Sequence, residues 1–396
     1  MNPEIIKEKI AQAVNILREK NIDMWMTFIR ESSTIHDPAL DMIAGINLTW
    51  HSALIINKDG EAAAIVGDME KENIARLDAY DKIFGFTKSV KEVLVDYISG
   101  KNPAQIAVNY SINSNLADGL TYGMYLTLKE YLKGTGYEDK LISSEVIIDS
   151  LKGRKSPSEL ELMKQAVKDA LEIFDETTLF IKPGVTEKEI ADFVKGQVSK
   201  RGLELSWDED HCPAVFTGPD PSSAHAGPTD RKVEKGHMIN MDFGVKCQGY
   251  CSDLQRTWYV LRDGEDKAPA EVQKGFDVIR DSIQKAADAV KPGVKGVDID
   301  KVARDYITKN GYEEYPHGLG HQVGTVAHDG GAGFYPAWEK YGSHPFLPIE
   351  ENSVLTIEPR LPVKDYGVST IEEEIVVTKN GCRFLSNPQK EIWLIK

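Results

Sequence analysis

The sequence feature that most constrains the fold is residues 239–258, where two runs alternate in the manner of paired β-strands. In the first run apolar side chains alternate with polar ones, and Asp242 is one of the polar ones. In the second run Asp253 and Gln255 share a face. A two-residue loop within 247–249, either 247–248 or 248–249, would join the runs as a hairpin. Either loop places Asp242 opposite Asp253 or Gln255, so both carboxylates lie on the same face.

Two neighbouring carboxylates on a strand pair repel each other. Their charge must be compensated by a shared proton, a basic partner or a cation. These residues alone leave open whether one aspartate simply faces solvent. The C-terminal third of the chain favours the cation, because it adds a second set of acidic side chains together with histidines.

Residues 316–331, PHGLGHQVGTVAHDGG, contain three histidines in a glycine-rich segment. Glycine allows the backbone to approach a ligand closely. Three surface histidines in a loop are the alternative. We interpret His317, His321 and His328 as parts of a binding site.

Residues 354–358 and 369–378 also alternate like strands. If the turn between them centres on Asp365, Glu358 falls opposite Glu372 and the acidic pair is repeated. Periodicity alone leaves Glu374 as an alternative to Glu372. Two aspartates, two glutamates and at least one histidine suit Mn²⁺, Fe²⁺, Co²⁺ or Zn²⁺, and bridging carboxylates indicate two ions about 3.5–4 Å apart. An acidic patch without metal is the alternative.

The rest of the chain predicts two domains within 396 residues. In residues 1–152 helical and strand patterns alternate, which is typical of an α/β domain. Residues 153–396 contain one arrangement twice: a helix, then Lys-Pro-Gly-Val at 182–185 or 291–294, then a second helix and strands. This internal repeat predicts a pseudo-symmetric α+β domain with helices outside a curved sheet.

Composition excludes some classes of partner. A formal net charge of -15 provides no basic excess for nucleic acid or an anionic membrane. The N-terminus lacks the apolar core of a signal peptide, and no run of 18 apolar residues occurs. The four cysteines form neither a paired zinc motif nor a disulfide pattern. We therefore predict a reduced, cytoplasmic protein.

The motifs MDFG, YCSDLQRT, HGLGH, TIEP and IEEEIVVT, in this order within residues 155–396, resemble those of the pita-bread metallopeptidases. That family includes methionine aminopeptidase, aminopeptidase P, prolidase and creatinase. The residues ahead of the motifs look like the creatinase-type N-terminal domain. The resemblance therefore favours the prolidase and aminopeptidase P branch and implies a homodimer.

The resemblance implies a dinuclear peptidase that hydrolyses the N-terminal Xaa-Pro bond of dipeptides or short peptides. Mn²⁺ is the first candidate for the two ions, and Co²⁺, Zn²⁺ and Fe²⁺ are alternatives. Among the implied bridging ligands it selects Glu372 over Glu374, together with Asp253. The implied metal ligands are Asp242, Asp253, His321, Glu358 and Glu372.

The resemblance also implies roles in catalysis. A hydroxide shared by the ions attacks the carbonyl before proline, Glu358 takes its proton, and His328 helps to stabilise the oxyanion. His225, in SSAHAG, orients the substrate, and His317 lies near the proline pocket.

Two departures from the family concern the substrate. Prolidases and aminopeptidases P usually have arginine two positions before the last glutamate ligand, where this chain has Thr370. Arg360, in IEPR, is placed to reach the same space. Residues 211–237 are longer and more polar than usual. A hydrolase or lyase of a non-peptide small molecule is therefore the alternative function, and a non-catalytic binding module is a third. The sequence leaves open the physiological metal and the choice between dipeptidase and aminopeptidase.

Overall fold

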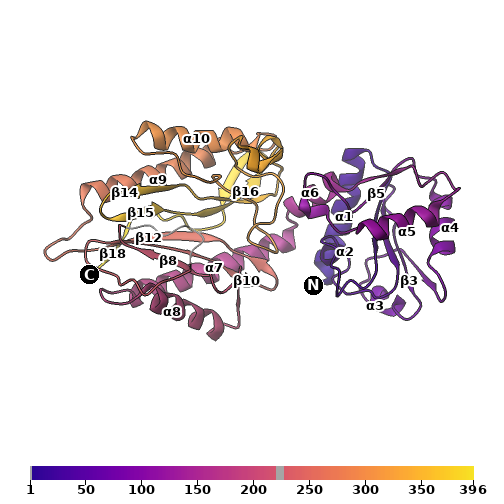
Figure 1. Ribbon diagram of the computed structural model, residues 1–396, viewed down its shortest axis with the longest axis horizontal. Coiled ribbons are helices and arrows are strands. Elements are labelled where there is room, and N and C mark those ends of the chain that lie inside the picture. Colours follow the sequence, from indigo (N-terminus) through magenta and orange to yellow (C-terminus); the bar gives the residue numbers. More distant parts are fainter. Residues whose placement is uncertain (1, 220–226) are drawn as a thin grey trace. The chain divides into compact units, whose positions relative to one another are not determined.

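The computed structural model describes residues 2–219 and 227–396, and the chain divides into two units, Met1–Lys152 and Gly153–Lys396 (Figure 1). His225, predicted to orient the substrate, lies outside the described residues. Within these residues, no helix is long and apolar enough to cross a membrane.

The first unit is built on a six-stranded mixed sheet in the order β4-β3-β2-β1-β5-β6. The antiparallel strands β1, β2 and β3 form its centre, and β4, β5 and β6 join in parallel. The strands are β1 (Met24–Ile29), β2 (Ser52–Asn57), β3 (Ala62–Gly67), β4 (Lys82–Phe86), β5 (Ile106–Val108) and β6 (Leu141–Ser143).

Helices cover both faces of this sheet, because its central strands are apolar on both sides. On β1, Trp25 packs into the core under α1, α2, α3 and α6, and Met26 packs into the core under α4 and α5. The predicted α/β character of residues 1–152 is confirmed. The helices are α1 (Pro3–Lys20), α2 (Leu40–Ile43), α3 (Lys71–Ala75), α4 (Lys91–Lys101), the 3₁₀ turn η1 (Asn115–Ala117), α5 (Tyr122–Leu132) and α6 (Glu145–Gly153).

In the second unit, two helix pairs lie outside a layer of strands (Figure 1). The pairs are α7 (Pro157–Phe180) with α8 (Glu187–Lys200), and α9 (Ala270–Ala289) with α10 (Gly296–Lys309). Two short 3₁₀ turns, η2 (Glu339–Tyr341) and η3 (His344–Phe346), follow α10. The strands form four small sheets in the orders β11-β10-β7, β18-β12-β9-β8, β13-β16-β17 and β14-β15.

The strands of the first half are β7 (Glu204–Leu205), β8 (Ala214–Thr217), β9 (Met238–Phe243), β10 (Val245–Cys247), β11 (Tyr250–Cys251) and β12 (Leu254–Val260). Those of the second half are β13 (Val354–Ile357), β14 (Arg360–Val363), β15 (Gly367–Thr370), β16 (Glu373–Thr378), β17 (Gly381–Phe384) and β18 (Trp393–Ile395). The last strand, β18, pairs in parallel with β12 and so returns to the first half.

The two Lys-Pro-Gly-Val corners have the same backbone structure. Gly184 N–H donates to the carbonyl of Val233, whose own N–H donates to Val185. Gly293 makes the matching bond to Ile349, whose N–H donates to Val294. Both glycines have positive φ, 98° and 88°, which side chains disfavour. The two halves of the α+β unit therefore make matching backbone hydrogen bonds at these corners, as the predicted pseudo-symmetry requires.

The first hairpin uses the loop Gln248-Gly249, with φ of 48° and 91° at these residues. Cys247 pairs with Tyr250, and the same register places Asp242 opposite Gln255. One of the two predicted loops is thereby selected, because the twist of a two-residue hairpin favours positive φ at both loop positions.

The second hairpin has the predicted register. Ile357 pairs with Glu373 and Arg360 pairs with Thr370, so Glu358 and Glu372 face each other between these pairs. Asp365 lies at the centre of the turn with φ of 67°.

Gly244, between β9 and β10, has no space for a side chain. A Cβ there would lie 1.9 Å from the carbonyl oxygen of Ser252. We expect Gly244→Ala to destabilise the protein by about 1–3 kcal/mol, because backbone must move to relieve the overlap. Gly196→Ala in α8 is the control, since nothing lies within 4 Å of its Cβ, and it should stabilise by up to about 1 kcal/mol. Urea unfolding measures both, and equal stability of the two variants would contradict this packing.

Candidate metal centre

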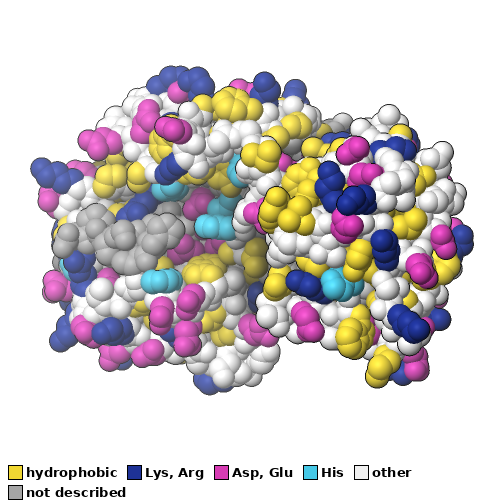
Figure 2. Space-filling model, turned by 45° about the vertical axis from the view of Figure 1, so that its right-hand side comes forward, with side chains coloured by type: hydrophobic (Ala, Val, Ile, Leu, Met, Phe, Trp, Pro, Cys, Tyr) yellow, Lys and Arg dark blue, Asp and Glu magenta, His cyan; other side chains and the backbone are white. Residues whose placement is uncertain are grey.

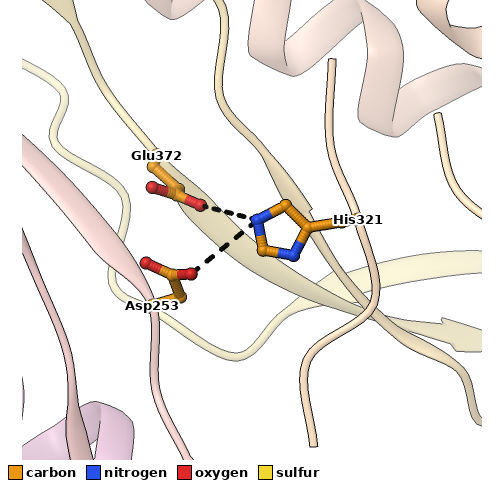
Figure 3. A group of neighbouring side chains, drawn as sticks. All are labelled: Asp253, His321 and Glu372. Atoms are coloured by element: carbon orange, nitrogen blue, oxygen red, sulfur yellow. Dashed lines mark ion pairs between the residues drawn. The ribbon is translucent and has the colours of Figure 1, made fainter. Parts of the chain in front are cut away.

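Three buried side chains from three separate segments converge in the second unit: Asp253, His321 and Glu372 (Figure 3). Each offers one ligand atom, and these atoms lie within 4.8 Å of one another. His321 Nε2 is 3.7 Å from Asp253 Oδ2 and 4.0 Å from Glu372 Oε1. Such a group of oxygen and nitrogen donors can hold a divalent cation.

Glu358 and Asp242 complete the predicted set. Glu358 Oε1 lies 3.3 Å from His321 Nε2. Asp242 lies across the hairpin from Gln255, whose Nε2 is 3.4 Å from Asp242 Oδ2 and 2.8 Å from Glu372 Oε2. The structure thus brings together all five residues predicted as ligands, and their binding of metal stays a prediction.

The two acidic hairpins are joined by their backbones. Gln255 N–H donates to the carbonyl of Glu372, and Glu372 N–H donates back to the carbonyl of Gln255. This isolated bridge connects the first half of the unit to the second. It places Asp253 and Glu372 side by side, which is what a shared ligand position requires.

The glycine-rich segment pairs with β13 and so carries His321 to the centre. Thr356 N–H donates to the carbonyl of His321, and Glu358 N–H donates to that of Leu319. A Cβ on Gly320 would lie 2.0 Å from the carbonyl oxygen of Thr356, so only glycine allows this approach. Close packing against β13 therefore explains why glycine stands beside His321 at position 320.

Two buried arginines hold the backbone around the centre, and sequence reasoning missed both. Arg256 donates to the carbonyls of Gln255 and Glu372 and forms an ion pair with Glu373. Arg304 donates to the carbonyl of His317. The alternation of the strand places Arg256 on the face opposite Asp253, between Leu254 and Trp258, so a charged residue between two large apolar ones was the available signal.

Burial and mutual repulsion disfavour the charged forms of three carboxylates. Burial, followed by the charge of Glu358, raises the pKa of Asp242 to about 7. Burial and the neighbouring carboxylates also raise the pKa of Asp253 and of Glu372 well above their usual values. For Glu358, burial acts in the same direction, but the hydrogen bond and charge of His321 outweigh it and lower its pKa.

The donor set fits a divalent cation. His321 Nδ1 lies 3.3 Å from the carbonyl oxygen of Gln322, which can only accept, so Nδ1 carries a proton. Without a cation, Nε2 is also protonated and donates to Glu358, and a divalent cation would replace that proton. Asp242 Oδ1 and Glu372 Oε1 are buried and have no hydrogen-bond partner within the described part of the chain. Leaving such oxygens unpaired is costly, and a cation would satisfy them.

The remaining predicted residues surround this centre. The His328 ring packs against the His321 ring at 4.1 Å between centroids. His317 and His328 both act electrostatically on Glu358 and lower its pKa. Figure 2 shows histidine and acidic side chains gathered in one region of the surface of the Gly153–Lys396 unit.

Arg360 stands directly across the hairpin from Thr370, the position where the family usually has arginine. Arg360 and Thr370 pair in the β14–β15 hairpin, and Glu358 and Glu372 lie two residues away from this pair on the side opposite the turn. Burial lowers the pKa of Arg360. The positions therefore agree with the expectation that Arg360 reaches the space beside Thr370.

The raised pKa of Asp242 makes stability depend on pH when metal is absent. Its proton stabilises the folded state below about pH 4, and this contribution is lost as the pH rises through about 7. In chelator, we expect Asp242→Asn to unfold at a higher temperature than the wild type at pH 8, with a smaller difference at pH 5. Mn²⁺ should stabilise the wild type more than the variant.

Differential scanning calorimetry measures these shifts. Asp305→Asn is the control, because Asp305 is an exposed aspartate whose pKa is lowered by its hydrogen bond to Lys301. An equal response of wild type and Asp242→Asn to pH and to Mn²⁺ would contradict a cation site at Asp242.

Comparison with known proteins agrees with this geometry. The model of metallopeptidase family M24 matches residues 161–379. A protein of Staphylococcus haemolyticus, named as an uncharacterized peptidase, is 30% identical over 342 residues, which are 85% of this chain and 88% of that protein.

Solved structures share the fold over nearly the whole chain. An X-Pro aminopeptidase from Thermotoga maritima has a TM-score of 0.71 at 24% identity and covers 96% of this chain and 99% of its own. An Xaa-Pro dipeptidase from Bacillus anthracis has a TM-score of 0.71 at 22% identity, with 100% of both chains covered. These matches confirm the predicted pita-bread fold. The chain belongs to metallopeptidase family M24, the pita-bread metallopeptidases that its sequence resembles.

Proposed function

We propose that this metallopeptidase hydrolyses the N-terminal Xaa-Pro bond of dipeptides or short peptides with two divalent ions. The observation that carries the proposal is the convergence of the carboxylates of Asp253, Glu358 and Glu372 on His321 Nε2. Asp242 joins this group through Gln255, and buried oxygens of Asp242 and Glu372 have no hydrogen-bond partner among the described residues. The aminopeptidase and dipeptidase structures that share the fold are named for Xaa-Pro substrates, which supports the choice of bond.

The five residues of the centre would hold the ions, with Asp253 and Glu372 shared between them. Four carboxylates carry enough negative charge to balance two divalent cations when His321 is neutral. Mn²⁺ is the first candidate, and Co²⁺, Zn²⁺ and Fe²⁺ are alternatives. When bound, the ions supply Lewis acidity, which makes water nucleophilic near neutral pH and polarises a carbonyl.

The protein's own groups would move the protons and orient the peptide. Glu358 is suited to accept a proton, because its lowered pKa keeps it ionised beside His321. His328, packed against His321, would donate to the carbonyl oxygen of the scissile bond. His317 would contact the proline side of the substrate, and His225 would orient the peptide.

Arg360 would bind the free carboxylate of a dipeptide. It is a partly buried cation two residues after Glu358, at the start of β14, and guanidinium groups pair well with carboxylates. We also propose a cytoplasmic homodimer. The buried free thiols of Cys212, Cys247 and Cys251 suit a reducing compartment.

A second candidate function is hydrolysis or elimination on a non-peptide small molecule. The uncharged Thr370 favours it, because Thr370 donates to Gln255 and is therefore committed to the centre rather than to a substrate.

We expect Mn²⁺-loaded protein to release the N-terminal residue from Xaa-Pro dipeptides or Xaa-Pro-Yaa tripeptides, and not from the same peptides with alanine in place of proline. Asp253→Asn should abolish cleavage. Glu358→Gln should lower kcat at least about 100-fold, because the proton acceptor is lost. Amino-acid release measured by chromatography tests this. Two bound ions without cleavage of any peptide would overturn the proposal and favour the non-peptide alternative.

We expect Arg360→Gln to raise KM for Xaa-Pro dipeptides about 10-fold to 100-fold, because a charge-assisted hydrogen bond to the carboxylate is lost. Dipeptides with an amidated C-terminus should show little change. Arg383→Gln, at an exposed arginine on β17, is the matched control. An equal effect on free and amidated dipeptides would rule out carboxylate recognition by Arg360.

A further inference from the structure

Gln255 contacts several of the proposed metal ligands, although it is neither a proposed ligand nor a proposed catalytic group. Its Nε2 lies 2.8 Å from Glu372 Oε2, 3.4 Å from Asp242 Oδ2 and 3.5 Å from Glu358 Oε2. Its backbone makes the bridge to Glu372 that joins the two halves. One neutral side chain therefore touches three of the four carboxylates.

Thr370 fixes which way the amide of Gln255 points. Thr370 Oγ1 lies 2.8 Å from Gln255 Oε1 and 3.2 Å from the carbonyl oxygen of Pro359, and the shorter contact favours donation of its proton to Gln255. An amide has acceptor and donor ends, so a donor at Oε1 directs the two N–H groups of Nε2 toward the carboxylates. The reversed amide would place its carbonyl oxygen against three carboxylates, which is electrostatically unfavourable.

Gln255 contacts one oxygen of each of these three carboxylates, and the other oxygen is the one that a cation could bind. In Asp242 and Glu372, Gln255 contacts one oxygen, and the other is buried without a hydrogen-bond partner among the described residues. Glu358 follows the same division, because its Oε2 faces Gln255 and its Oε1 faces His321 Nε2. By binding one oxygen of each of these carboxylates, the amide determines which oxygen is available to a cation.

We propose that Gln255, oriented by Thr370, is a positioning residue that sets the orientation of Asp242, Glu358 and Glu372 for binding of divalent ions. A neutral amide suits this role because it donates two hydrogen bonds without adding a positive charge that would compete with the cations. The inference rests on the proposed metal centre. It assigns to Gln255 and Thr370 a shared role in metal affinity.

The test is Mn²⁺ binding to the purified full chain, followed by isothermal titration calorimetry and by electron paramagnetic resonance of the bound ions. Gln255→Met, which keeps the length and removes both donors, should weaken Mn²⁺ binding about 10-fold to 100-fold and change the resonance spectrum. Thr370→Val, which keeps the shape and removes the hydroxyl, should change both in the same direction by less. Thr370→Ser, which keeps the hydroxyl, should have the same Mn²⁺ affinity and resonance spectrum as the wild type.

Gln389→Met is the matched control. Gln389 is also a buried glutamine of this unit, and its side chain bonds the backbone of Thr257 instead of a proposed ligand. It should lower the unfolding temperature while Mn²⁺ affinity stays at the wild-type value. Thermal unfolding and circular dichroism of every variant separate loss of the fold from loss of metal.

The outcomes separate this inference from the proposed function. Wild-type Mn²⁺ affinity in folded Gln255→Met, or an equal loss in Gln389→Met, overturns the role of Gln255 and leaves the peptidase proposal standing. A wild type that binds two ions and cleaves no peptide overturns the peptidase proposal, and the affinities of the variants still decide the role of Gln255. A wild type that binds no Mn²⁺ overturns both.

Discussion

The repulsion among four carboxylates, two buried and two half-buried, is the constraint on which the second unit depends. Asp242, Asp253, Glu358 and Glu372 would separate if they were free to move, because burial weakens the screening of their charges. The backbone prevents this: each hairpin supplies one acidic pair, and the bridge between Gln255 and Glu372 joins the hairpins. The folded backbone therefore offsets the electrostatic repulsion between the carboxylates. A bound cation would remove this repulsion and so stabilise the folded state.

The repeated helix pairs place the two hairpins in equivalent positions. Each pair turns at a Lys-Pro-Gly-Val corner with the same two backbone hydrogen bonds to the segment ahead of its strands. The side chains at the corners differ. Thr186 caps α8 with a capping box, whereas α10 starts after Lys295, whose ammonium group cannot accept a hydrogen bond. The pseudo-symmetry is thus a property of the backbone path, because α8 has a side-chain cap at its start and α10 does not.

Local periodicity was sufficient to place each acidic pair on one face of its hairpin, although two loops stayed open for the first hairpin and the second register also needed a turn centred on Asp365. Alternation with a period of two places Asp242 with Asp253 and Glu358 with Glu372, and the structure has both arrangements. Periodicity could not separate Glu372 from Glu374, because both lie on one face. The difference is tertiary: Glu374 accepts the N–H of Asp253, a residue 121 positions away. The same limit applies to Arg256, whose partners are carbonyls that only the folded chain brings together.

Two neighbouring residues of β12, Gln255 and Arg256, both hold Glu372 in place. Gln255 and Arg256 point to opposite sides of β12, yet both bind Glu372, the first through its carboxylate and the second through its carbonyl. The side chain and the backbone of Glu372 are thereby fixed independently. The uncharged Thr370 belongs to this arrangement, because it orients the amide of Gln255, while the nearest arginine of the hairpin stands across from it at position 360. Positive charge thus lies on the strand that follows Glu358 instead of the strand that precedes Glu372. Under the proposed function, orientation of the metal ligands would fall to Gln255 and Thr370, and recognition of a substrate anion to Arg360 on the opposite strand of the hairpin.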